Sequence, residues 1–138
     1  MGVNIWAVIV TTLVAYVIGA IWYSVLFQKQ WMEVTGANKR SPEEMKKMAK
    51  EAGPFYVVQL LITLLQVYVL ARFINQAADT NGLETAIWIF AGFILPTLIS
   101  AVMWTGVDRR LMKKQIGIQL GCQIVTLVVM GAILGMWR

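Results

Sequence analysis

Four long apolar segments restrict what this chain can fold into more than any other feature. Each is about 20 residues long, which is the length that an α-helix needs to cross a bilayer. Between them lie polar, charged segments, at residues 28–54 and 106–115 above all. The sequence therefore predicts an all-α integral membrane four-helix bundle, formed as one membrane domain over residues 1–138. The expected spans are residues 5–27, 55–74, 86–105 and 116–137.

The composition supports lipid as the solvent of this chain. Hydrophobic residues make up 59% of the 138 residues and charged residues 14%, whereas about a quarter of a soluble domain is charged. A chain this short has too much surface to hide so much apolar area in one core. The net charge of +5 would suggest nucleic acid as the partner of a soluble protein, but in a membrane protein it reports topology. We expect no nucleic-acid partner.

The basic residues predict the orientation of the bundle. Ten of the twelve Lys and Arg residues lie in segments 28–54 and 106–115, and the other two are Arg72 and Arg138. Loops rich in Lys and Arg stay in the cytoplasm. We therefore expect a multi-pass protein of the cell (inner) membrane, with both termini outside. No basic residue precedes the first apolar run, so we expect a retained span and not a signal peptide.

Aromatic residues near the ends of the spans agree with this orientation. Trp and Tyr prefer the two membrane–water interfaces, where the ring meets lipid and the polar atom meets water. The expected interface anchors are Trp6, Trp22, Tyr23, Trp31, Trp88, Trp104 and Trp137.

The first basic loop contains a predicted short helix. Ser41 can cap it, Pro42 suits its first position, and Glu44 completes a capping box. Its lysines and methionines lie on different faces, as in an amphipathic helix. One interpretation is a helix on the inner membrane surface, with its basic side near anionic lipid headgroups. The other is a partner-binding or gating helix.

Polar side chains inside the spans are amides and hydroxyls, because the middle of every span lacks Asp, Glu, Lys and Arg. They recur at i, i+4, i+7 on the second and fourth spans and so share one face of each helix. Two interpretations stay open: hydrogen-bonding glue between helices or subunits, and the lining of a solute or water path. The candidate lining residues are Tyr16, Gln59, Thr63, Gln66, Thr97, Ser100, Gln119, Gln123 and Thr126.

Small residues mark where helices can approach closely. The fourth span carries two GxxxG spacings, which permit close contact within the chain or between subunits. In the third span, Pro96 removes a backbone donor. We expect a homo-oligomer. The candidate packing residues are Gly19, Gly92, Pro96, Gly117, Gly121, Gly131 and Gly135.

Residues for catalysis or metal binding are scarce. The chain has one cysteine, Cys122, and no histidine, so a zinc site or a His-dependent triad is excluded within one chain. No nucleophile–base pair or phosphate-binding loop is recognisable. We expect no cofactor, no metal and no enzymatic activity.

The end of the first span resembles the signature of a small membrane family catalogued as domain of unknown function 1761. The family pattern is a Trp-Tyr-Ser-Pro-Leu-Phe-Gly-Lys-x-x-Trp-like run, and Val25 and Gln28 stand here where Pro and Gly are usual. The matching residues are Trp22, Tyr23, Ser24, Phe27, Lys29 and Trp31, followed in the second half by Gly92, Phe93, Pro96, Gly131, Gly135 and Trp137. The resemblance implies a four-helix integral membrane protein and no established activity.

Two functional hypotheses follow from these patterns. The first is a transport or channel-like protein for a neutral or weakly polar solute or ion, lined by the Gln/Thr ladders. The second is a structural or accessory membrane protein that docks to partners or lipids through its glycine faces and basic first loop. Anionic lipid of the inner leaflet is an expected partner under either hypothesis.

Overall fold

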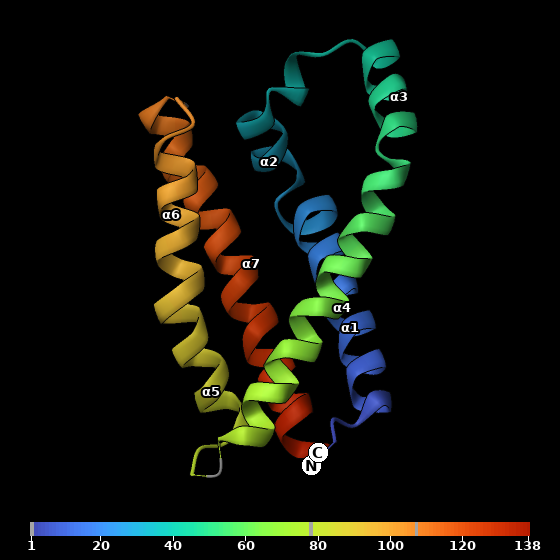
Figure 1. The fold of residues 1–138 in the computed structure, drawn as a ribbon. Coiled ribbons are helices and arrows are strands. Elements are labelled where there is room, and N and C mark those ends of the chain that lie inside the picture. Colours follow the sequence, from blue (N-terminus) through green and yellow to red (C-terminus); the bar gives the residue numbers. More distant parts are fainter. Residues whose placement is uncertain (1, 78, 107) are drawn as a thin grey trace.

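The computed structural model describes residues 2–77, 79–106 and 108–138. Its regular elements are helical throughout these residues, and four stretches are long and apolar enough to cross a membrane (Figure 1). The predicted all-α fold with four candidate spans is therefore confirmed. The four stretches are Ile5–Leu26, Gly53–Gln76, Gly82–Met103 and Arg109–Met136.

Two of the four stretches contain a wider, π-helical turn. In the third stretch this turn ends at Ile94, two residues before Pro96, which has no N–H to donate to the preceding helical turn. A π turn accommodates such a break without ending the helix. The elements are α1 (Ile5–Ile21) with η1 (Trp22–Leu26), α4 (Gly53–Gln76), α5 (Gly82–Ile89) with η3 (Phe90–Ile94) and α6 (Leu95–Met103), and α7 (Arg109–Met136).

The first loop is more ordered than the sequence predicts. It contains α2 (Gln28–Thr35), the short 3₁₀ turn η2 (Ala37–Lys39) and α3 (Pro42–Glu51). The predicted short helix is α3, and its cap is formed as expected, because the Glu44 N–H donates to Ser41 Oγ at 3.2 Å. Its place on the inner membrane surface stays a prediction. We did not predict α2.

The basic residues 109–114 are helical, although the sequence placed them in the segment 106–115 between the third and fourth spans. They form the first turns of α7, which begins directly after Asp108. Asp108 can end the loop because its carboxylate accepts the Arg110 N–H at 3.4 Å. The loop before the fourth apolar stretch is therefore shorter than residues 106–115, and the cations of this segment project from a helix.

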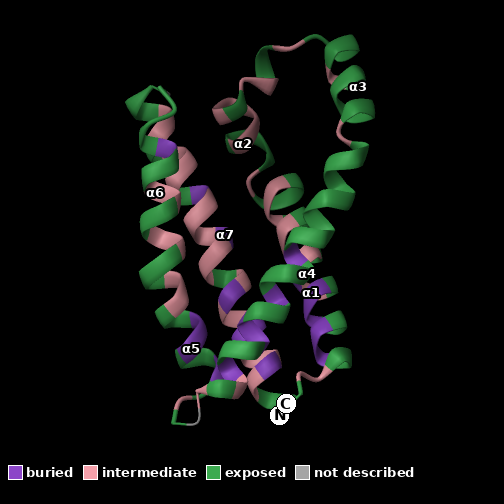
Figure 2. Ribbon diagram, viewed as in Figure 1, coloured by how far each residue is buried: buried purple, intermediate pink, exposed green. Residues whose placement is uncertain are grey.

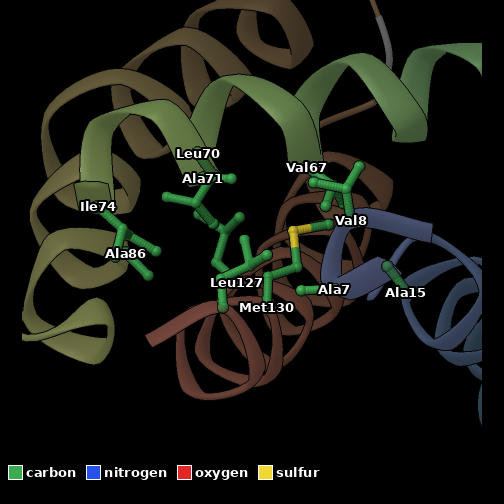
Figure 3. Packing of buried hydrophobic residues seen from close by; sticks show 11 residues of the cluster. Ala7, Val8, Ala15, Val67, Leu70, Ala71, Ile74, Ala86, Leu127 and Met130 are labelled. Atoms are coloured by element: carbon green, nitrogen blue, oxygen red, sulfur yellow. The ribbon is translucent and has the colours of Figure 1, made fainter. Parts of the chain in front are cut away.

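The buried core lies at the end of the molecule where both termini are found (Figure 2). Small residues of α1, α4 and α5 let the helices approach, and larger residues of α4 and α7 fill the space between them (Figure 3). The core residues are Ala7, Val8, Ala15, Val67, Leu70, Ala71, Ile74, Ala86, Leu127, Met130 and Leu134.

Toward the opposite end the bundle opens. Figure 1 shows α4 and α6 diverging toward the end that carries α2 and α3. Every residue of α4 from 53 to 62 is exposed, so this half of the helix has no covered face. The protein thus closes as a four-helix bundle at one end only.

Candidate functional site

The π turn η1 joins the first span to the last. Its first residue, Trp22, donates its indole N–H to the backbone carbonyl of Ile118 on α7 at 2.9 Å. The same indole lies against Gly121, where an added Cβ would be 2.8 Å from the ring atom Cζ2. A buried or half-buried Trp needs a partner for its N–H, and here the α7 backbone supplies it. Gly121 leaves the room that the ring occupies.

Aromatic contacts then turn the chain from the span into α2. Phe27 has φ −124° and ψ 25°, which ends the helical geometry between η1 and α2. The rings of Trp22 and Phe27 have centroids 4.9 Å apart, and those of Tyr23 and Trp31 are 4.7 Å apart. Both distances fall in the range favoured by aromatic pairs. Aromatic contacts therefore hold together the bend between η1 and α2, from Trp22 to Trp31.

Ion pairs fasten α2 to the start of α7. Glu33 contacts Lys114 Nζ at 2.8 Å and Arg110 Nη2 at 3.4 Å. The hydrogen bond from Lys114, together with its charge and that of Arg110, holds the pKa of the Glu33 carboxyl below its ordinary value. Individual surface ion pairs contribute little to the stability of a protein. We therefore infer that the two ion pairs of Glu33 mainly fix the position of α2 against α7. We name the contacts of Trp22, Trp31 and Glu33 with their partners the aromatic junction.

The family model described as protein of unknown function (DUF1761) matches residues 6–135. The chain belongs to this family. The resemblance inferred from the aromatic run is thereby confirmed, and in this DUF1761 protein the run forms the aromatic junction. No curated protein and no solved structure matches the chain significantly. The DUF1761 description assigns no activity, so function must be argued from the geometry.

The glycines of α7 divide between two contacts inside the chain. Gly131 and Gly135 lie against Gly82, at the start of α5: a Cβ on Gly131 would be 2.6 Å from the Gly82 carbonyl oxygen. Gly121 receives the Trp22 ring. Gly19, Gly92 and Gly117 face open space, since nothing lies within 4 Å of an added Cβ. Close packing inside the chain therefore uses the second GxxxG spacing.

The candidate lining residues form local contacts. Gln59 Nε2 donates to Thr63 Oγ1 at 3.3 Å on the same helix, and the Tyr16 hydroxyl donates to the Tyr56 carbonyl at 3.2 Å, which links α1 to α4. Thr126 Oγ1 lies 3.9 Å from Cys122 Sγ on α7. Thr63 is buried; Tyr16, Gln119, Gln123 and Thr126 are half-buried; Gln59, Gln66, Thr97 and Ser100 are exposed.

Two apolar grooves flank α4. The first lies between α1 and α4, and its walls include Ile9, Leu61 and Tyr68. The second, with a volume of about 360 Å³, lies between α4, α5, η3 and α7. Among the candidate lining residues, Gln66 alone contributes to either groove. The structure does not bring the candidate lining residues together around one of these two grooves.

The proposed interface anchors fall into two groups. Trp6, Trp88, Trp104 and Trp137 are exposed, as an anchor in contact with lipid headgroups must be. Trp22, Tyr23 and Trp31 are half-buried in the aromatic junction, where their rings contact protein. Their contact with the membrane interface stays a prediction, but packing gives these three residues an additional role.

Sequence reasoning missed the aromatic junction because its partners lie far apart in the chain. Trp22 and Ile118 are 96 residues apart, and a backbone acceptor leaves no mark in a sequence. One signal was present: Glu33 is the only acidic residue between Lys29 and Arg40, which suits a partner on another basic element. Over the described ranges, no group of three His, Cys, Asp or Glu residues is placed so that it could hold a metal ion.

Proposed function

We propose that this protein is a structural or accessory membrane protein that assembles with copies of itself. The observation that carries the proposal is the uncovered half of α4, on which Gln59 is exposed, with Gln66 exposed further along the helix. Lipid tails offer no hydrogen-bond partner to an amide, so a polar side chain on a spanning helix favours contact with protein. An assembly of subunits supplies that contact.

The distribution of charge supports the proposed orientation. The cations of α2, α3 and the first turns of α7 gather at the end away from the termini (Figure 1). Under the positive-inside rule, this arrangement favours an orientation with that end in the cytoplasm and both termini outside a cell (inner) membrane.

The same end is suited to anionic lipid. Lys46, Lys47 and Lys50 of α3 are exposed, and so are Arg109 and Lys113 of α7. Cations at a membrane surface attract anionic headgroups by about 1 kcal/mol each. We propose that this basic surface, including the lysines of α3, binds the inner leaflet.

A transport or channel-like role is the second candidate, and the same exposed amides favour it. Gln59 and Gln66 could line a path for a neutral or weakly polar solute if that path runs between subunits. No catalytic role is part of either proposal.

Flux measurements on reconstituted protein separate the two candidates. The structural proposal predicts that proteoliposomes swell in neutral solutes no faster than protein-free liposomes, while the protein remains oligomeric. The double substitution Gln59→Leu with Gln66→Leu should then weaken the oligomer. A solute flux that this double variant abolishes, with the oligomer intact, would instead establish transport.

A further inference from the structure

The exposed side of α4 carries a regular stripe of residues. Successive members of the stripe are separated along the sequence by four and three residues in turn, which is the spacing of the contact positions in a coiled coil. Both glutamines occupy the same place in this repeat, seven residues apart. All members are exposed, from 41% at Val69 to 70% at Phe55 among the apolar ones. The α4 stripe consists of Phe55, Gln59, Ile62, Gln66, Val69 and Phe73.

The stripe is distinct from the face that α4 uses inside its own chain. That face is formed by Thr63, Val67, Leu70, Ala71 and Ile74, all of them buried. At 100° per residue, the centre of the stripe lies about 100° around the helix from the centre of that buried face. The chain therefore covers one face of α4 and leaves a second, coiled-coil-like face without a protein partner in the part that is described.

Hydrogen-bonding capacity on the stripe is unused. The Gln59 amide reaches Thr63 Oγ1 on its own helix, which leaves its carbonyl oxygen without a partner from the described residues. Gln66 makes no side-chain hydrogen bond within them and borders the apolar second groove. Since an amide both donates and accepts, one glutamine can pair with an identical glutamine.

We propose that the α4 stripe is the subunit interface, formed by two copies of this chain around a two-fold axis along the membrane normal. The inference rests on the proposed self-assembly and names its surface. Such symmetry brings each residue opposite its own copy, so Gln59 meets Gln59 and Gln66 meets Gln66 of a second copy. The ten-to-two division of Lys and Arg gives all copies one orientation, which makes the paired α4 helices parallel.

Other helix-packing surfaces support this choice. Gly131 and Gly135, which could have mediated a dimer, are occupied by Gly82 of the same chain. Gln66, Val69 and Phe73 also border the second groove, opposite the exposed Phe93. A second α4 against the stripe would lie along the mouth of that groove and cover apolar surface on both sides of it.

Disulfide cross-linking tests the interface with matched neighbours. Cys122 is the only cysteine, so Cys122→Ala gives a background without thiols. Ile62→Cys and Val69→Cys lie on the stripe and retain both glutamines. Leu61→Cys and Tyr68→Cys are their sequence neighbours on the other side of the helix, with comparable exposure of 59% and 42%. The proposal predicts dimer cross-links at positions 62 and 69, and at least tenfold less at positions 61 and 68.

Each other outcome overturns the proposed parallel two-fold interface. Equal cross-linking at all four positions would show random collision, and none at 62 or 69 would show that lipid covers the stripe. Cross-linking at 62 without 69 would indicate antiparallel helices, because only positions near the centre of the stripe then meet their own copies. The subunit number, measured on the same samples before oxidation, separates two failures: an oligomer without these cross-links refutes the interface alone, whereas a monomer refutes self-assembly.

Discussion

Trp22 illustrates how a single residue near the end of a span can serve packing. An indole at this depth is often an anchor to the lipid headgroups. In this protein its N–H meets the Ile118 carbonyl and its ring meets Gly121, so the residue ties the first span to the last. The recurrence of the aromatic run in the family signature acquires a physical reason in these contacts.

Replacing Trp22 with Phe should lower the stability of the bundle. An aromatic ring remains, but the smaller Phe side chain lacks the indole N–H and part of the ring that lies against Gly121. The lost hydrogen bond alone contributes about 1 kcal/mol to the free energy of unfolding. Equilibrium unfolding of the purified protein in mixed micelles measures the change. Trp104→Phe is the matched control, because Trp104 is 81% exposed and its replacement should change stability by less than about 0.5 kcal/mol. Equal effects of the two substitutions would refute the role assigned to Trp22.

Glu33 makes the position of α2 sensitive to acid. The pKa of Glu33 is lowered in the folded protein by its ion pairs. The stabilisation that these ion pairs give to α2 is therefore complete above the ordinary Glu pKa of about 4.3, and it is lost as the pH falls through the lower pKa of the folded state. Spin labels on Gln30→Cys and Lys113→Cys, in the Cys122→Ala background, report the distance from α2 to α7. That distance should be constant at neutral pH and should increase only when the pH falls below the ordinary pKa of a glutamate, about 4.3. Glu33→Gln should remove the acid response; a distance that still responds in this variant would assign the effect to another group.

At the scale of elements, close contact between α5 and α7 organises the closed end of the bundle. Gly82, Gly131 and Gly135 let two backbones meet, and the apolar core lies beside them. The sequence predicted that α7 packs through glycine but could not tell which GxxxG spacing does so. The choice depends on where α5 begins, and that is set by the Asn81 cap, whose side-chain oxygen accepts the Glu84 N–H at 2.8 Å.

Gly131→Ala should destabilise the protein by about 1–3 kcal/mol, because the new methyl group overlaps the Gly82 carbonyl oxygen and the Ala86 Cβ. Gly117→Ala is the control on the same helix. It has open space around it, and the better helix propensity of alanine should leave it neutral or up to about 1 kcal/mol more stable. Unfolding curves of the two variants provide the comparison. If Gly117→Ala destabilised the protein and Gly131→Ala did not, the close helix contact would lie at Gly117 and not at Gly131, and the account would be contradicted.

For the whole molecule, the sequence predicted the spans and the short helix α3, because hydropathy, capping residues and proline act locally. It did not predict α2, the aromatic junction or the open end of the bundle, which depend on contacts between distant segments such as Glu33 with Lys114. The sequence predicted that Gln and Thr recur along one face of the second and fourth spans. It did not predict whether these side chains are buried in the bundle or exposed on its outside. Only the arrangement of α4 relative to α1 and α7 determines that Thr63 is buried while Gln59 and Gln66 are exposed.

The central claim is that a second copy of the chain covers the α4 stripe with its two glutamines. Single-molecule photobleaching of labelled protein in liposomes counts subunits while the lipid excess is raised. We predict that the wild-type protein remains at two or more subunits on dilution in lipid, and that Gln59→Leu with Gln66→Leu shifts it toward one. A wild-type protein that is monomeric at every dilution would contradict the account.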